Sequence, residues 1–195
     1  MAYGRTIGLF SIGNRKLGKQ TIIFNLSSAT NCPSRKRGMC EYADICYAKK
    51  AERTWPRVLP FRERQHAWWR ETDWKEIYEF MKPLIKMYGI KYFRFNEAGD
   101  FEDKEDIAKL NRIAIALQTA LGTITYGYTR RYDLNFSGVK FIVRGSNWKG
   151  PNGMTTIIKS DEPIPEGYQL CPGDKCGVAC TECMIPNSNV AFHQH

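Results

Sequence analysis

Apolar residues recur every three to four positions in residues 75–88 and 103–121, and a glycine follows each segment. This period predicts two amphipathic helices that end at Gly89 and Gly122. Acidic residues crowd the start of the second segment, where they complement the helix dipole. Residues 60–71 also read as a helix.

Short runs rich in β-branched and aromatic residues lie between and after these helices. They predict strands at residues 20–26, 90–96, 123–129, 139–144, 154–159 and 168–170. The first three strands alternate with helices, which indicates a parallel α/β sheet. The later strands are joined by segments too short for helical crossovers, and a full eight-fold barrel needs about 250 residues. We therefore expect an α/β fold, a truncated or partial (β/α) barrel, with residues 1–195 as one domain and residues 20–160 as its core.

Polar residues follow the predicted strands at their carboxyl ends. Solvent exposure alone gathers polar residues there, but ligands of parallel α/β folds also bind at this edge. Glu97 and Asp100 flank an Ala-Gly pair that lets a ligand approach the backbone, and their carboxylates can hold an amine or a hydroxyl. The candidate catalytic residues are Glu97, Asp100, Arg94, Tyr128 and Arg130, and the candidate cofactor-binding residues are Asn96, Gly99, Arg144, Ser146 and Asn147.

The seven cysteines fall into two groups. Cys32, Cys40 and Cys46 form C-x7-C-x5-C, directly after the first predicted strand. Three thiolates leave one iron of a cubane cluster open, as catalytic zinc sites keep one position open. The alternatives are ordinary buried thiols, or a fourth ligand such as Asp44 or His66.

The second group is Cys171, Cys176, Cys180 and Cys183, within residues 168–186. Zinc ribbons usually separate two C-x2-C pairs by a dozen or more residues. Four cysteines within 13 residues are closer to the wrapped cluster loops of bacterial ferredoxins. We expect a closed [4Fe–4S] cluster here, with zinc or unligated thiols as the alternatives. His193 and His195 read as residues of a frayed tail.

Positive charge is concentrated near the N-terminus. Residues 1–70 hold 14 Lys and Arg against 4 Asp and Glu, whereas the net charge of the whole chain is +9. The excess is either a solvated face or a basic mouth for an anionic substrate, a nucleotide or a nucleic acid. No apolar run approaches the roughly 18 residues of a membrane span. With an odd number of cysteines and no recognisable signal peptide, we expect a soluble protein of a reducing cytoplasm.

Several short motifs carry a family resemblance: Cys32–Pro33, Cys40, Cys46–Tyr47–Ala48, Arg94–Phe95, Gly99–Asp100–Phe101 and Tyr128–Thr129–Arg130. On these the chain resembles the phage "gene product 88" family over roughly residues 20–183. That family looks like a distant, shortened relative of radical S-adenosylmethionine (SAM) enzymes. Those enzymes usually carry C-x3-C-x2-C after the first barrel strand, with an aromatic residue before the last cysteine; here Tyr47 follows it. Their Gly-Gly-Glu motif, which binds the SAM amino group, is replaced at the matching point by residues 97–100.

The resemblance implies an iron–sulfur enzyme with an open [4Fe–4S] site, an auxiliary [4Fe–4S] cluster, SAM as a possible cofactor and a small anionic or nucleotide-like substrate. For a phage-encoded protein, the compartment is the host cytoplasm. One alternative is a SAM-independent iron–sulfur enzyme that binds a small molecule at the open iron. Another is a non-catalytic metalloprotein that binds nucleic acid by stacking bases on Trp55, Trp68, Trp69 and Trp74.

Overall fold

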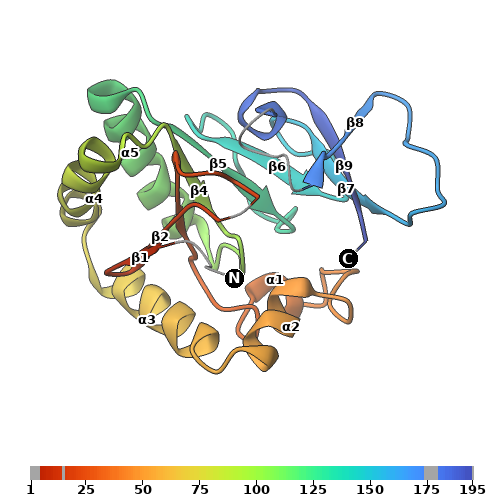
Figure 1. The fold of residues 1–195 in the computed structure, drawn as a ribbon, viewed down its shortest axis with the longest axis horizontal. Coiled ribbons are helices and arrows are strands. Elements are labelled where there is room, and N and C mark those ends of the chain that lie inside the picture. Colours follow the sequence, from red (N-terminus) through yellow and green to blue (C-terminus); the bar gives the residue numbers. More distant parts are fainter. Residues whose placement is uncertain (1–4, 15, 174–179, 195) are drawn as a thin grey trace.

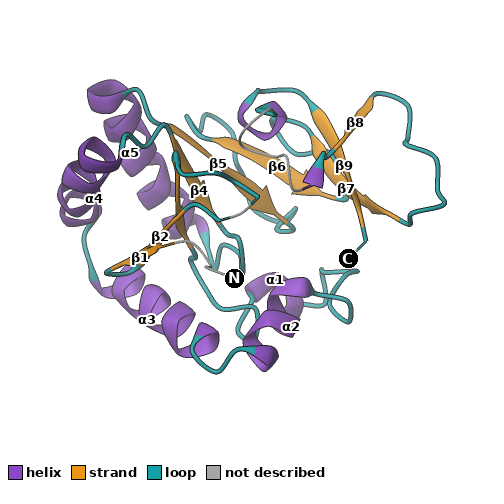
Figure 2. Ribbon diagram, in the orientation of Figure 1, coloured by secondary structure: helices purple, strands orange, loops and turns teal. Residues whose placement is uncertain are grey.

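A computed structural model of the chain describes residues 5–14, 16–173 and 180–194. Within this part of the chain, nine strands form one mixed sheet (Figures 1 and 2). The strands are β1 (Arg5–Ile7), β2 (Phe10–Ile12), β3 (Thr21–Phe24), β4 (Tyr92–Phe95), β5 (Ile124–Thr129), β6 (Ile142–Ser146), β7 (Met154–Ile158), β8 (Tyr168–Leu170) and β9 (Asn189–His193). The helices are α1 (Pro33–Lys36), α2 (Tyr47–Thr54), α3 (Val58–Glu71), α4 (Trp74–Tyr88), α5 (Lys104–Leu121) and the 3-10 helix η2 (Glu182–Met184).

The strand order is β1-β2-β3-β4-β5-β6-β7-β9-β8. The first two pairs are antiparallel, and every pair from β3 onward is parallel. The expected α/β class is therefore confirmed. The sheet is not closed, because β1 and β8 are its two edges. Because β3, β4 and β5 are parallel neighbours, their carboxyl ends lie side by side.

Helices α3, α4 and α5 cover one face of the sheet (Figure 2). The main core lies between them, where Phe24, Phe93 and Phe95 from the strands pack with residues such as Met81 and Leu110 from the helices. Burial of this apolar surface is the main stabilising contribution. The alternate residues of the same strands point to the opposite face, where the site described below lies.

The predicted helices and their ends are confirmed. Asp73 and Asp103 cap α4 and α5 by accepting hydrogen bonds from main-chain amides, and both helices end at a left-handed glycine, Gly89 and Gly122. Pro83 lies inside α4, which continues through it. The predicted strand at 139–144 is displaced to β6, because the Lys140 amide donates to the Asn111 side chain on α5 instead of joining the sheet.

The second half of the described chain contains no α-helix after α5, as the short connections predict. A smaller cluster of buried residues covers the open face of β5 there, formed with η2 and β9. The tail prediction for His193 is wrong: this residue belongs to β9, which inserts between β7 and β8 and pairs Ile158 with His193. His195 lies outside the described residues.

Candidate functional site

A cavity of about 410 Å³ opens at the carboxyl ends of β3, β4 and β5. Loops that follow these strands form its floor, and α1, α2, β7 and β9 contribute to its walls. Its size suits a small-molecule site. The wall contains many of the residues predicted from the sequence: Cys32, Cys40, Cys46, Arg94, Asn96, Glu97, Gly99, Asp100, Tyr128, Arg130 and Ser146.

Three cysteines on the α1–α2 segment line this cavity together. Cys32 and Cys46 are the residues directly before α1 and α2, and Cys40 lies in the loop between the two helices. Neither Cys32 nor Cys46 caps its helix with its side chain. Since capping does not occupy these two side chains, they remain available to a ligand.

The surroundings of Cys32 and Cys40 keep both thiols protonated. Burial, together with the Asp100 carboxylate, raises the pKa of Cys32 to about 12, although the amides of Ser34 and Arg35 act in the opposite direction. Burial also raises the pKa of Cys40. Thiolates at these positions therefore require a bound cation to hold their charge.

Arg130 anchors the loop that carries Cys40. Its Nε donates to the Met39 carbonyl at 2.8 Å, and its other nitrogens contact the carbonyl of Ser146 and the carboxylate of Glu41. The Arg130 side chain is only 7% exposed, whereas its partner Glu41 is largely exposed. We predicted a catalytic role for Arg130, and its hydrogen bonds show that it positions the cysteine loop.

Asp100 connects three segments of the site. Its carboxylate accepts hydrogen bonds from Ser34 Oγ at 2.5 Å, Thr129 Oγ1 at 2.6 Å, and the amides of Arg130 and Phe101 at 2.7 and 2.9 Å. Burial nevertheless raises the pKa of this carboxyl group. With four donors already bound, Asp100 has little capacity left for the amine predicted from the sequence.

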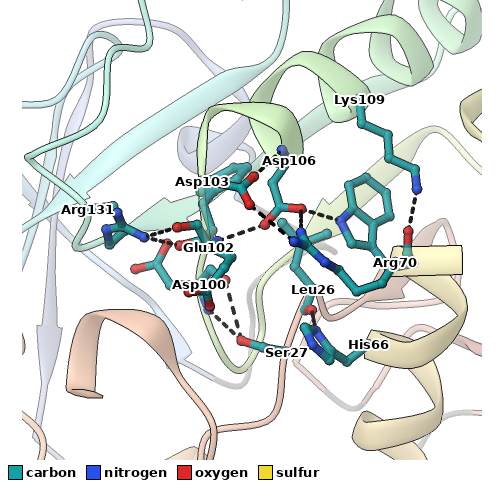
Figure 3. Close-up of polar contacts among 12 residues, drawn as sticks. Leu26, Ser27, His66, Arg70, Asp100, Glu102, Asp103, Asp106, Lys109 and Arg131 are labelled. Carbon is teal, nitrogen blue, oxygen red and sulfur yellow. Dashed lines mark hydrogen bonds and ion pairs between the residues drawn. The ribbon is translucent and has the colours of Figure 1, made fainter. Parts of the chain in front are cut away.

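Figure 3 shows further polar contacts around Asp100, Asp106 and His66. Ser27 Oγ accepts a hydrogen bond from the Asp100 amide, and Asp106 accepts from Arg70 at 2.8 Å. His66 Nδ1 lies 2.6 Å from the Leu26 carbonyl, to which it donates. Neither His66 nor the exposed Asp44 lines the cavity, so the arrangement favours neither as a fourth ligand.

Arg94 and Tyr128 lie side by side on the open face of the sheet. The guanidinium of Arg94 is 5.4 Å from the centre of the Tyr128 ring. Its Nε is buried and has no hydrogen-bond partner among the described residues. Burial would lower the pKa of Arg94, but Tyr47, Tyr128, Tyr126 and Glu97 outweigh it and raise the pKa, so Arg94 stays charged.

Asn96 and Glu97, which come shortly after Arg94 in the sequence, also line the cavity. Asn96 has a positive φ of 53°, which asparagine tolerates, and its Oδ1 accepts from the Leu26 amide at 3.3 Å. Its buried Nδ2 has no partner within the described chain. Glu97 Oε1 accepts from Asn14 Nδ2 at 3.1 Å and has further acceptor capacity.

Gly99 has a structural purpose in addition to the one predicted. A Cβ at this position would lie 2.2 Å from Ser27 Oγ and 2.3 Å from the Ser27 carbonyl oxygen. The absence of a side chain therefore lets the loops after β3 and β4 touch, in addition to leaving room for a ligand.

Two of the predicted cofactor-binding residues do not line the cavity. Arg144 is fully buried and donates to the carbonyls of Cys183, Glu182 and Ser188. It therefore fixes η2 and the segment that follows it, which argues against a role in cofactor binding. Asn147 donates a hydrogen bond to Glu41 and accepts one from Thr156, and its neighbour Ser146 lines the cavity instead.

Two of the C-terminal cysteines, Cys171 and Cys183, lie on the same face of the sheet. Cys171 and Cys183 line a second cavity of about 30 Å³, and Arg94, Tyr128, Lys16 and Phe192 belong to the walls of both cavities. Burial raises the pKa of Cys183, although Tyr128 donates a hydrogen bond to its sulfur. Cys180 is half-buried, and Cys176 lies outside the described residues.

The polar residues of the large cavity that sequence reasoning missed include Asn14, Lys16 and His193. Asn14 and Lys16 come from the β2–β3 connection. His193 comes from β9, and its Nδ1 is buried without a partner among the described residues. Asn14 and Lys16 fall in a short polar connection and His193 near the end of the chain, so local sequence carried no signal for them.

The tryptophans do not form an exposed stacking surface. Trp69 is 1% exposed and donates from Nε1 to Asp106 at 2.7 Å. Trp68 and Trp74 pack against the main core, and only Trp55 of the four is exposed. Helix packing therefore accounts for three of the four residues that suggested base stacking.

In the described parts of the chain, no three His, Cys, Asp or Glu side chains are gathered closely enough to hold a single metal ion. In an iron–sulfur cubane each thiolate binds a different iron, so the thiols lie farther apart than around one ion. Among the helices that the structure describes, none combines the length and apolar character that a membrane span requires.

The fold and site together define a mixed α/β protein with a cysteine-lined cavity at the carboxyl ends of its parallel strands. The chain belongs to the gene product 88 family, which it matches over residues 8–148. This range includes the three N-terminal cysteines and ends before the four C-terminal ones. No curated protein and no solved structure gives a match to the chain.

Proposed function

We propose that this protein is an iron–sulfur enzyme in which Cys32, Cys40 and Cys46 hold a [4Fe–4S] cluster with one open iron. One observation carries the proposal: all three thiols line the same cavity, at the edge of the sheet where α/β proteins bind ligands. Main-chain amides directed at Cys32 and Cys40 fit sulfur ligands, because hydrogen bonds to sulfur tune such clusters.

The bound cluster would supply an electron and an iron with a free coordination position. The chain's own residues define the rest of the site. Arg130 and Asp100 fix the cysteine loop against the ends of β4 and β5. Glu97 offers a carboxylate to an amine or hydroxyl of a ligand, while Arg94 and Tyr128 face the same space.

Within this proposal the enzyme is of radical SAM type, and its open sheet is a partial barrel. Glu97 lies in the cavity wall and has acceptor capacity for the SAM amino group. The C-terminal cysteines would hold an auxiliary [4Fe–4S] cluster, with zinc as the alternative metal. Cys171 and Cys183 share one small cavity, which fits ligands of a common centre.

A SAM-independent iron–sulfur enzyme is the second candidate, and a specific observation favours it. The four hydrogen bonds to Asp100 leave Glu97 as the one predicted carboxylate with free acceptor capacity. A small molecule or anion bound directly at the open iron needs fewer contacts than SAM does.

Paramagnetic resonance of the reduced protein separates the two candidates. If SAM binds the open iron, adding it should change the spectrum of one cluster, and Glu97→Gln should weaken the change. Slow formation of 5′-deoxyadenosine should follow. A spectrum that stays unchanged at saturating SAM, but responds to small anions or thiols, would replace the first candidate by the second.

A further inference from the structure

Arg94 is a half-buried cation with an enclosed Nε, and no described carboxylate neutralises its charge by direct contact. Its guanidinium makes no hydrogen bond or ion pair within the described chain, and Nε is completely enclosed. A charged group removed from water is costly unless it is paired. Two buried arginines are paired by contrast, Arg62 with Glu52 at 2.9 Å and Arg131 with Asp133 at 2.7 Å. Arg94 therefore differs from them in lacking an anion.

Two more residues of the same cavity wall carry a buried polar atom without a partner among the described residues. Asn96 Nδ2 is a donor two residues after Arg94, and its orientation is fixed because Oδ1 binds the Leu26 amide. His193 Nδ1 comes from β9. Buried polar atoms are rarely left without a partner, and such exceptions need an explanation. A ligand that carries oxygen acceptors would meet the Arg94 guanidinium in this cavity, whose wall also contains Asn96 and His193.

The charges around Arg94 favour an anion. Lys16 lies in the wall beside it, with Nζ 5.6 Å from the centre of the Phe192 ring. Two acidic residues of the described chain also belong to the wall: Asp100 is occupied by its own donors, whereas Glu97 accepts one hydrogen bond from Asn14 and keeps further acceptor capacity. Guanidinium groups bind carboxylates and phosphates through two parallel hydrogen bonds.

We propose that Arg94 and Asn96 form an anion-binding subsite for a carboxylate or phosphate group of the substrate, with Lys16 and His193 at its border. The inference rests on the proposed function only in calling the anion a substrate, because the subsite needs no cluster to bind. Arg94 also lines the small cavity of Cys171 and Cys183, so the bound anion would lie between the two cysteine groups.

Calorimetric titration with inorganic phosphate and, separately, with acetate tests the subsite and distinguishes the two anion classes. Wild-type protein should bind at least one of them saturably. Arg94→Gln should weaken this binding by about tenfold or more, because hydrogen bonds to charged groups contribute about 1.5–3 kcal/mol. Asn96→Asp should also weaken it, since it keeps the backbone conformation but replaces a donor by an acceptor. Arg112→Gln, an exposed arginine on α5, is the matched control and should bind like wild type.

Absence of saturable binding of both anions by wild-type protein overturns the subsite. So does unchanged binding in both Arg94→Gln and Asn96→Asp. If Arg94→Gln does not fold, Asn96→Asp decides alone. Iron and sulfide are measured in the same preparations. Anion binding without iron would contradict the proposed cluster but not the subsite. Iron without anion binding would contradict the subsite but not the cluster.

Discussion

At the scale of single residues, the loops around the cavity depend on close contacts that few side chains permit. Gly99 has a φ of 74° and lies directly against Ser27, whose hydroxyl accepts from the Asp100 amide. The contact joins the loop after β3 to the loop after β4. Any side chain at residue 99 must separate the two loops that carry the site.

Gly99→Ala should therefore cost clearly more than the strain of a left-handed alanine, which is about 1–2 kcal/mol. Gly138→Ala is the matched control, because its φ of 76° is nearly the same and a Cβ there meets nothing within 4 Å. Chemical denaturation of both variants measures the difference. Equal losses of unfolding free energy would show that the contact with Ser27 is unimportant.

Arg130 is the second residue whose effect can be isolated. Arg130→Gln removes the contact with the Glu41 carboxylate. The shorter glutamine side chain also weakens the hydrogen bond to the Met39 carbonyl. The loop around Arg37, which is exposed, should then open more often, and trypsin should cleave it faster. Arg112→Gln should leave the cleavage rate unchanged. A wild-type rate in Arg130→Gln would refute the anchoring role.

At the scale of elements, a buried ion pair holds α2 to its neighbours. Glu52 accepts from Arg62 at 2.9 Å and from the amides of Ala29 and Thr30 at 2.7 and 2.8 Å. It thus connects α2, α3 and the segment between β3 and Cys32. Burial would raise the pKa of Glu52, but Arg62 and the hydrogen bonds outweigh it and lower the pKa below its ordinary value of 4.5.

A lowered pKa means that the ionised pair stabilises the fold above pH 4.5 and that this contribution is lost as the pH falls further. Glu52→Gln should cost about 3 kcal/mol at neutral pH, because Arg62 is left buried without its partner. The deficit should shrink in denaturation experiments below pH 4.5. Glu63→Gln, on the exposed face of α3, is the control and should change stability by less than about 0.5 kcal/mol. A deficit that is constant with pH would contradict the ion-pair account.

At the scale of the whole molecule, local sequence patterns predicted most of the sheet and the helices that cover it. Helical periodicity, Gly89 and Gly122 were sufficient for α4 and α5, since caps and apolar faces are local features. Strand-end polarity brought Arg94, Glu97 and Tyr128 to one site. It could not show that the hydrogen-bonding capacity of Asp100, Arg130 and Arg144 is used within the protein. All their partners described above, except the amide of Phe101, are 15 or more residues away in sequence. The insertion of β9 beside β7 is equally non-local, so the position of His193 in the sheet and in the cavity wall could not be predicted.

The central claim is that Cys32, Cys40 and Cys46 together hold an iron–sulfur cluster. Anaerobic purification followed by iron and sulfide analysis tests it most directly, in wild type and in Cys40→Ser. Wild-type protein should be brown, with about eight irons and eight sulfides per chain when both cysteine groups hold cubanes, and Cys40→Ser should lose about four of each. Colourless wild-type protein without sulfide, or Cys40→Ser with wild-type iron content, would contradict it.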